Sequence, residues 1–174
     1  MRRSSAWFAV ILTGRFGRRL NGSQPRTAAP PDGRNDMTNA KVRNLVQTAR
    51  DASERAYAPY SRFQVGAAVL CESGTVFTAC NVENASYGLT VCAERAAIFG
   101  AVAAGERRFR ALAVYADADE PAPPCGACLQ VLSEFADDLP IYLAGHGGGW
   151  REVRLRELFP VPFGRAAFGE RRKD

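Results

Sequence analysis

Two cysteine-containing segments, far apart in the sequence, place the strongest constraint on how this chain can fold. Cys92-Ala93-Glu94 forms the first, and Pro124-Cys125-Gly126-Ala127-Cys128 forms the second. Thiolates are good zinc ligands, and three of them leave the fourth tetrahedral position open for water, as in catalytic zinc sites. A chain that uses all three sulfurs must bring both segments to one ion.

Both segments also stand at the starts of expected helices. Cys92 would open one helix, while Cys125 and Cys128 would lie one turn apart at the start of another. A helix N-terminus lowers the pKa of a cysteine through its dipole and its N–H groups, which favours the thiolate. Arg95 could balance the charge of three thiolates by hydrogen-bonding to them. The alternative for Arg95 is an ordinary surface position.

Glu94 is the candidate catalytic residue because its carboxylate can move protons without binding the metal. It could take a proton from a water that zinc activates, pass it to a ring nitrogen, and help an amine leave as ammonia. The alternative is a solvent-facing glutamate beside a structural zinc, which needs a fourth protein ligand. The only histidine, His146, stands in the glycine-rich stretch 145–149, which is typical of a hairpin tip.

The net charge of +5 comes from one end of the chain. Residues 1–36 hold seven arginines and two aspartates, whereas residues 37–174 hold sixteen basic and sixteen acidic residues. A nucleic-acid binder carries its basic surface on the folded part, so neutrality beyond residue 36 argues against a nucleic-acid partner. No apolar run approaches the roughly 20 residues of a membrane span, and the sequence predicts no membrane partner.

The first 36 residues differ in kind from the rest. Their arginines and short apolar run suggest a secretory signal, but arginines follow the run and no small-residue cleavage site ends it. A mitochondrial presequence would also be rich in Arg and Ser and poor in acids, but the segment has no convincing long amphipathic repeat. In the third interpretation, translation starts at Met37 and residues 1–36 are an upstream extension from a misassigned start. This interpretation is favoured because Met37 opens a sequence with a helical pattern. We expect residues 1–36 to be a disordered extension and residues 37–174 to form the domain.

Hydrophobic periodicity predicts alternating helices and strands after an initial hairpin. The helices are expected from Asn39 to about Ala56, over 92–104 and 125–135, and briefly before Phe159; the strands are expected over 63–71, 75–80, 109–116, 141–144 and 150–154. This order indicates an α/β fold in which a mixed sheet has helices on both faces. Five cysteines, an odd number with uneven spacing, favour a reducing, cytoplasmic compartment over a disulfide framework.

Four blocks resemble the small homotetrameric zinc-dependent cytidine deaminases of the cytidine/deoxycytidylate deaminase family. They span residues 60–68, 81–87, 92–95 and 124–128 and occur in that family's order and spacing, within a resemblance from about Asn39 to Gly164. The resemblance implies a three-layer αβα fold with a five-stranded mixed sheet and one zinc per subunit. It also implies hydrolytic deamination of cytidine and 2'-deoxycytidine, in pyrimidine salvage, by a homotetramer with shared active sites.

The same resemblance implies substrate-binding roles. Asn81 and Glu83 are similar to the pair that hydrogen-bonds the ribose hydroxyls, and an amide next to an acceptor-only carboxylate suits such a group. A polar turn after a strand is the alternative for these two residues.

Aromatic residues complete the implied nucleoside site. Phe63 is similar to the phenylalanine that packs on the pyrimidine ring, although an ordinary core position is an equal alternative. Phe163 is similar to a phenylalanine that a neighbouring subunit donates. The backbone near Ala85 and the hydroxyl of Tyr87 are similar to further nucleoside contacts, with Tyr87 acting across a subunit boundary.

One residue departs from the family pattern. Leu129 stands where the family usually has an arginine before Gln130. If that arginine balances the thiolates, Arg95 must do so alone here.

Other functions remain open at this point. One is deamination of a different small molecule, such as an aminonucleoside antibiotic, which would not need the whole 81–87 block. Deamination of polynucleotides is a second alternative, but such enzymes usually have a histidine ligand and a basic surface, and the sequence indicates neither here. A third alternative, from another functional class, is a zinc-stabilised binding module without catalysis.

Overall fold

A five-stranded mixed sheet forms the centre of the part of the chain that the computed structural model describes, residues 37–164. Its strand order is β2-β1-β3-β4-β5, and only β3 and β4 run parallel to each other. The parallel pair requires a crossover, and the helix α3 supplies it. The strands are β1 (Val65–Cys71), β2 (Val76–Cys80), β3 (Phe109–Ala116), β4 (Pro140–Ala144) and β5 (Trp150–Arg154).

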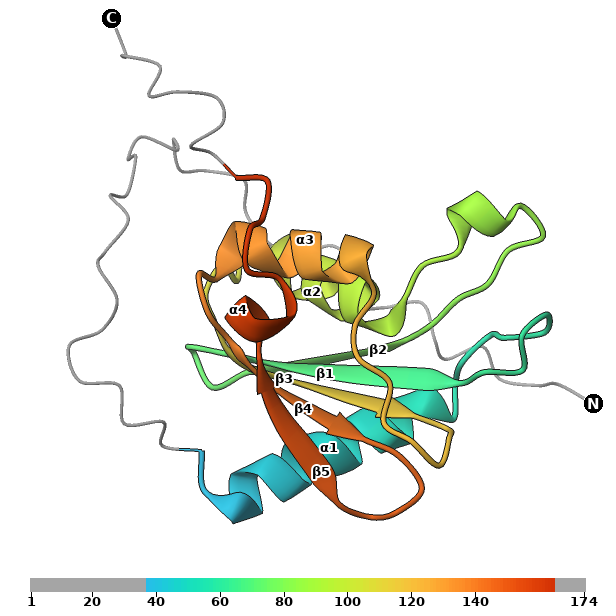
Figure 1. Ribbon diagram of the computed structural model, residues 1–174, viewed down its shortest axis with the longest axis horizontal. Helices are drawn as coiled ribbons and strands as arrows, with labels where there is room; N and C mark the ends of the chain where they lie inside the picture. Colours follow the sequence, from blue (N-terminus) through green and yellow to red (C-terminus); the bar gives the residue numbers. More distant parts are fainter. Residues whose placement is uncertain (1–36, 165–174) are drawn as a thin grey trace, which may run out of the picture. The chain divides into compact units, whose positions relative to one another are not determined.

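Helices cover both faces of this sheet, which gives three layers (Figure 1). One helix, α1, lies on one face, and the other α-helices lie on the opposite face. The α-helices are α1 (Asn39–Ser53), α2 (Ala93–Ala103), α3 (Gly126–Phe135) and α4 (Leu155–Leu158), and a 3-10 turn, η1, covers Tyr87–Leu89. The three-layer αβα fold with its mixed sheet is therefore confirmed.

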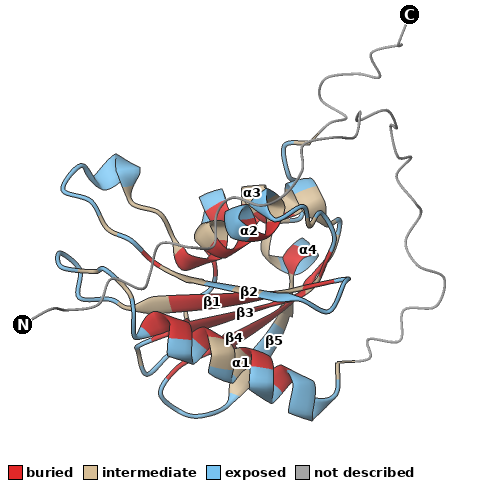
Figure 2. Ribbon diagram, turned by 180° about the vertical axis from the view of Figure 1, so that it is seen from behind, coloured by how far each residue is buried: buried red, intermediate tan, exposed pale blue. Residues whose placement is uncertain are grey.

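Side chains alternate between the two faces of the sheet, which gives each helical layer its own apolar cluster to pack on. On β3, Leu112 and Val114 face the cluster under α2 and α3, whereas Ala113 and Tyr115 face the cluster over α1. The central strands are buried on both faces, as Figure 2 shows in red. Apolar area buried on each side stabilises the fold by about 25 cal/mol per Å². Because α2 and α3 pack on the sheet through such area, the sheet fixes the positions of these two helices.

Gly66 allows α1 to approach the sheet closely. A Cβ at this position would lie 1.9 Å from the carbonyl oxygen of Ala49 and 2.5 Å from the nitrogen of Ser53. Since both are backbone atoms of a helix, they cannot move aside. The glycine of the 60–68 block therefore has a packing role.

Two expected boundaries were wrong by more than one residue, and hydrogen bonds explain both. The first helix ends at Ser53, before Ala56, because the N–H of Ala56 donates to Ser53 O in a tight final turn. The first strand begins at Val65, after Phe63, because the side-chain amide of Asn81 occupies the main chain there.

The expectation for residues 1–36 lies outside the described residues, and the extent of the domain from residue 37 to residue 174 stays a prediction. Within residues 37–164, no helix is both long and apolar enough to cross a bilayer.

Candidate metal centre and nucleoside site

Three cysteine sulfurs converge where α2 and α3 begin. Cys92 is the N-cap of α2, Cys125 is the N-cap of α3, and Cys128 lies in the first turn of α3. The Sγ atoms of Cys92 and Cys125 are 3.8 Å apart, and those of Cys125 and Cys128 are 3.5 Å apart. A tetrahedral zinc with Zn–S bonds of about 2.3 Å places its sulfurs about 3.8 Å apart. The cluster therefore fits a single zinc ion.

The surroundings favour a thiolate at Cys92. A hydrogen bond from the Cys128 thiol lowers the pKa of Cys92 from 9.0 to about 5, and Arg95 and Cys125 add to this effect. Partial burial opposes it. Arg95 Nη2 lies 3.7 Å from the Cys92 sulfur and donates to the carbonyl of Thr90 at 3.2 Å. The guanidinium thus contacts the sulfur and is held in place by main chain.

Glu94 is a buried carboxyl beside this cluster. Its side chain lies in the first turn of α2, and the residue is only 4% exposed. Burial raises its pKa above the ordinary value, and the negative charge of Cys92 adds to the increase. Cys128 lies within hydrogen-bonding reach of it. A buried acid next to a zinc-binding cluster can hold a proton and release it, so the arrangement is suited to proton transfer.

Leu129 places no charge at the cluster. Its side chain is buried among the apolar residues under α2 and α3. The position that departs from the family pattern therefore contributes to core packing, and Arg95 supplies the guanidinium contact with a sulfur.

A segment between β2 and α2 links the cluster to the second part of the site. We call residues 81–91 the arm. It leaves the sheet and returns through an isolated bridge between Val82 and Val91, the residue before Cys92. A second bridge joins Val82 to Tyr57. The loop 57–64, the arm and the cluster are thereby joined side by side.

Asn81 and Glu83 hold the loop 57–64. Asn81 Oδ1 accepts from the N–H of Val65 at 2.9 Å, and its Nδ2 donates to Phe63 O at 2.9 Å. Glu83 accepts from the N–H groups of Tyr60 and Ser61 and from the Ser61 hydroxyl, which lowers the pKa of the carboxyl. One amide N–H of Asn81 and lone pairs on both side chains remain for a ligand.

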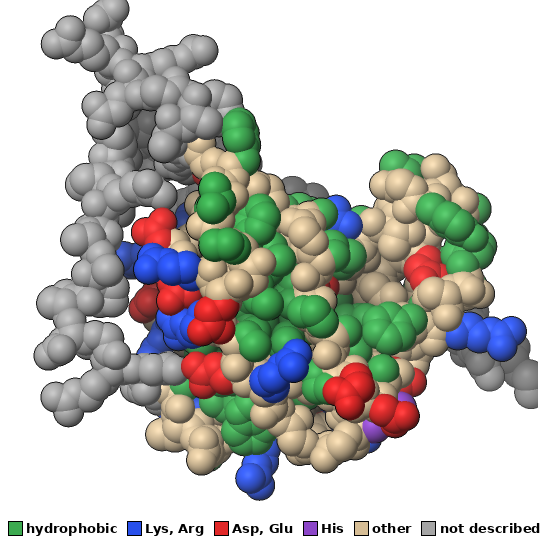
Figure 3. Space-filling view, in the orientation of Figure 1, with side chains coloured by type: hydrophobic (Ala, Val, Ile, Leu, Met, Phe, Trp, Pro, Cys, Tyr) green, Lys and Arg blue, Asp and Glu red, His purple; other side chains and the backbone are tan. Residues whose placement is uncertain are grey.

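The remaining expected substrate residues are exposed. The exposed fractions are 38% for Phe63, 75% for Tyr87 and 62% for Phe163, and Ala85 is also exposed. Tyr87 makes an edge contact with the ring of Tyr60, with centroids 5.9 Å apart. Hydrophobic side chains gather on the projecting arm (Figure 3), where Val82 and Leu89 are also exposed.

Sequence reasoning missed three residues that organise the site. Thr90 holds Arg95, and Tyr60 and Ser61 hold Glu83. Only Ser61, a hydroxyl in the 60–68 block, gave a signal, because such a group can accept and donate at a turn. Its pairing with Glu83 depends on contacts between distant segments.

Two cavities lie away from the cysteines. One, of about 330 Å³, is lined by residues 119–121 and by residues of the β4–β5 turn between Gly145 and Arg151. The other, of about 270 Å³, lies between α3, α4 and Pro162. No cysteine of the cluster lines either one, so in a single chain the cluster does not open into these cavities.

Comparisons with known proteins agree with this site. The family model described as "Cytidine and deoxycytidylate deaminase zinc-binding region" matches residues 39–144. A cytidine deaminase of Sporosarcina psychrophila is 48% identical over 123 residues, which cover 70% of this chain and 90% of that protein. A cytidine deaminase of Mycobacterium tuberculosis is 45% identical over 125 residues, 69% of this chain and 87% of that protein.

A solved structure also agrees in fold. The crystal structure of cytidine deaminase from Burkholderia pseudomallei superposes with a TM-score of 0.68 at 47% identity and covers 73% of this chain and 100% of that one. The family model that matches is a zinc-binding region, and the three-cysteine cluster fits one ion. The expected zinc cofactor is therefore confirmed. The chain belongs to the zinc-dependent cytidine and deoxycytidylate deaminase family.

Proposed function

We propose that this protein hydrolyses cytidine and 2'-deoxycytidine to uridine and 2'-deoxyuridine, with release of ammonia, in pyrimidine salvage. The observation on which this depends most is the buried carboxyl of Glu94 next to three converging cysteine sulfurs. Relatives named cytidine deaminase, at 45–48% identity, support the choice of nucleoside.

Glu94 would transfer the protons of this reaction. Cys92, Cys125 and Cys128 would hold the zinc ion, which when bound would supply Lewis-acid chemistry that makes water nucleophilic near neutral pH. Glu94 takes one proton as the water oxygen bonds to C4 of cytosine and delivers it to N3 of the ring. The second water proton follows the same route to the exocyclic amine. The C4–N bond then breaks, and ammonia leaves as the C4 carbonyl forms.

Asn81 and Glu83 would bind the sugar. Both side chains keep hydrogen-bonding capacity after holding the loop 57–64, and Glu83 retains its negative charge because its pKa is lowered by Ser61 and the neighbouring N–H groups. A charged acceptor suits a ribose hydroxyl, which donates one hydrogen bond. The loop held by these residues presents Phe63 for the pyrimidine ring.

A neighbouring subunit would complete the site in a homotetramer. Tyr87 and Phe163 are exposed aromatic residues on the arm and on the segment after α4. An aromatic residue exposed to this degree gains more from burial in a partner than from solvent. We propose that both residues line a site on an adjacent subunit, and that main chain near Ala85 is a further nucleoside contact.

The cysteines support a cytoplasmic location. All five have free thiols, and two of them, Cys71 and Cys80, lie in β1 and β2 outside the cluster. Free thiols persist in reducing compartments.

Glu94→Ala tests the proposed chemistry. The variant is expected to keep one zinc per subunit, because Glu94 is not a ligand, and to lose ammonia release from cytidine by about 10³-fold or more. Metal analysis and an absorbance assay with cytidine, deoxycytidine and free cytosine measure both quantities.

Glu72→Ala is the matched control, since Glu72 is exposed on the β1–β2 turn. It should retain wild-type activity. A wild-type protein that releases no ammonia from cytidine would contradict the proposal, and activity on free cytosine alone would contradict the sugar-binding role of Asn81 and Glu83.

A further inference from the structure

A pair of hydrogen bonds joins α3 to the segment that follows α4. Gln130 Nε2 donates to the carbonyl oxygen of Phe163 at 2.7 Å, and Gln130 Oε1 accepts from the N–H of Phe163 at 3.3 Å. The primary amide pairs with the main chain of one residue as a neighbouring strand would. Two bonds from one planar group fix both the position and the orientation of that main chain.

Core packing fixes the start of this segment. Leu155 of α4 is buried, and Phe159 packs against the same apolar cluster and donates from its N–H to Leu155 O at 2.8 Å. Asp138 holds α4 from the other side, because it accepts from Arg154 Nη2 at 2.8 Å and from the N–H of Arg156 at 3.3 Å. The chain therefore leaves α4 from a defined point.

Residues 160–162 offer few groups that could hold the segment. Val161 is 85% exposed, so its side chain adds no core packing. Pro160 and Pro162 have no N–H to donate. The hydrogen bonds from Gln130 act at the end of this stretch, at Phe163.

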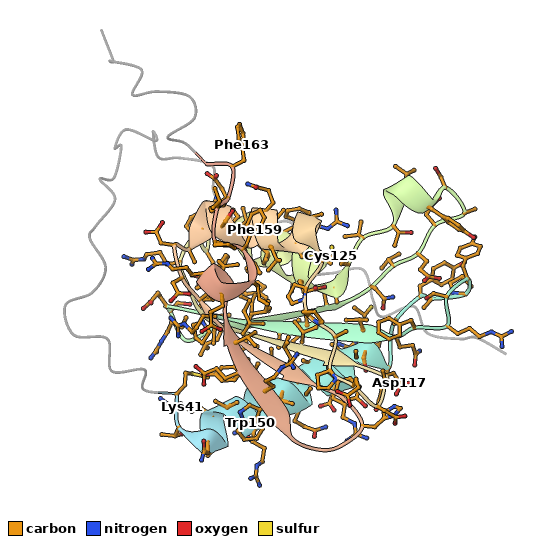
Figure 4. The ribbon with its side chains drawn as sticks, viewed as in Figure 1. Lys41, Asp117, Cys125, Trp150, Phe159 and Phe163 are labelled. Carbon is orange, nitrogen blue, oxygen red and sulfur yellow. The ribbon has the colours of Figure 1, made fainter. Side chains whose placement is uncertain are left out.

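The ring of Phe163 does not point to the cysteines of its own chain. Figure 4 shows it projecting beyond α3, away from Cys125 at the start of that helix. Gln130 lies on the same helix, two positions after Cys128. The helix that supplies two of the sulfurs thus also holds the aromatic residue that leaves the subunit.

We propose that Gln130 is a positioning residue for the deaminase reaction: its amide clamps the main chain of Phe163 and holds the ring where a neighbouring subunit's substrate site can receive it. This inference rests on the proposed function, because it assumes that Phe163 contacts the nucleoside. Gln130 acts through Phe163 and touches neither substrate nor zinc. Its loss should weaken substrate binding and leave the chemical step in place.

Gln130→Met tests the clamp, because methionine keeps the length of the side chain and removes both hydrogen bonds. The expected result is a roughly five- to thirty-fold rise in KM for cytidine, with kcat changed much less and zinc content unchanged. Hydrogen exchange at the Phe163 amide should become faster. Gln130→Glu keeps an acceptor for that N–H but loses the donor. Its KM for cytidine should lie between those of the wild type and Gln130→Met.

Gln47→Met is the matched control, since Gln47 is exposed on α1 across the sheet and bonds to Asp51. It should keep the wild-type KM. Phe163→Ala and the double variant Gln130→Met/Phe163→Ala should have the same KM, because Gln130 acts only through that ring.

Three outcomes are distinguishable. An active wild type with an unchanged KM in Gln130→Met would overturn the clamp and leave the proposed function intact. A KM rise that persists in full in the Phe163→Ala background would also overturn it. A wild type without activity on cytidine would instead contradict the proposed function.

Discussion

The cysteine cluster and the arm differ in how much of their surroundings one chain supplies. The cluster lies where two helices begin against a buried sheet, and its sulfurs are within 4.8 Å of one another. The arm, residues 81–91, projects from the sheet and is mostly exposed (Figure 2). The proposed shared site accounts for this difference: one subunit would form the chemical centre, and a second surface would complete the binding site.

Cys128→Ser should have the largest effect. The side chain is fully buried in the first turn of α3, and a hydroxyl is a poor zinc ligand compared with a thiolate. We expect zinc to be lost at micromolar protein concentrations and activity to fall by more than about 10³-fold. Metal analysis after gel filtration measures the loss. Full zinc occupancy in this variant would show that the cluster is not the metal site.

Tyr87→Ala should have an intermediate effect confined to binding. Since the residue is 75% exposed, its removal should leave the melting temperature of the subunit fold nearly unchanged while KM rises by about tenfold. Steady-state kinetics and thermal unfolding are measured on the same sample. A variant with wild-type KM would place Tyr87 outside the substrate site.

Ser61→Ala should have the smallest effect, on the charge of Glu83. The pKa of Glu83 is lowered from its ordinary value near 4.5 mainly by the Ser61 hydroxyl, so in the variant it should move back toward 4.5. A lowered carboxyl pKa stabilises the fold above the unfolded value and loses that contribution as pH falls through the folded value. The variant should therefore lose less stability on acidification. NMR titration of Glu83 measures the shift, and an unchanged pKa would contradict the assigned hydrogen bond.

The sheet, its flanking helices and the cysteine cluster could be predicted from the sequence because they depend on local pattern. Cys92 and Cys125 mark helix starts, and alternation on β3 marks a strand buried on both faces. The start of β1 could not be predicted, because the side chain of Asn81 replaces a strand partner there. Strand periodicity contains no information about such a contact.

The contacts between distant segments were also beyond sequence reasoning. Ser61 pairs with a residue 22 positions away, Glu83, and Gln130 pairs with one 33 positions away, Phe163. Leu129 shows the same limit in another way. Its position next to Cys128 suggested a missing charge at the zinc site, whereas its side chain lies in the apolar core.

A subunit-mixing experiment tests most directly whether one chain supplies the chemistry and a neighbour completes the binding site. Glu94→Ala and Phe163→Ala subunits are co-expressed, and the kinetics of the mixed oligomers are compared with those of each parent. Random assembly gives about a quarter of sites with both an intact Glu94 and a neighbour's intact Phe163. We expect this fraction to have wild-type KM, whereas activity equal to the sum of the two parents would show that each site is complete within one chain.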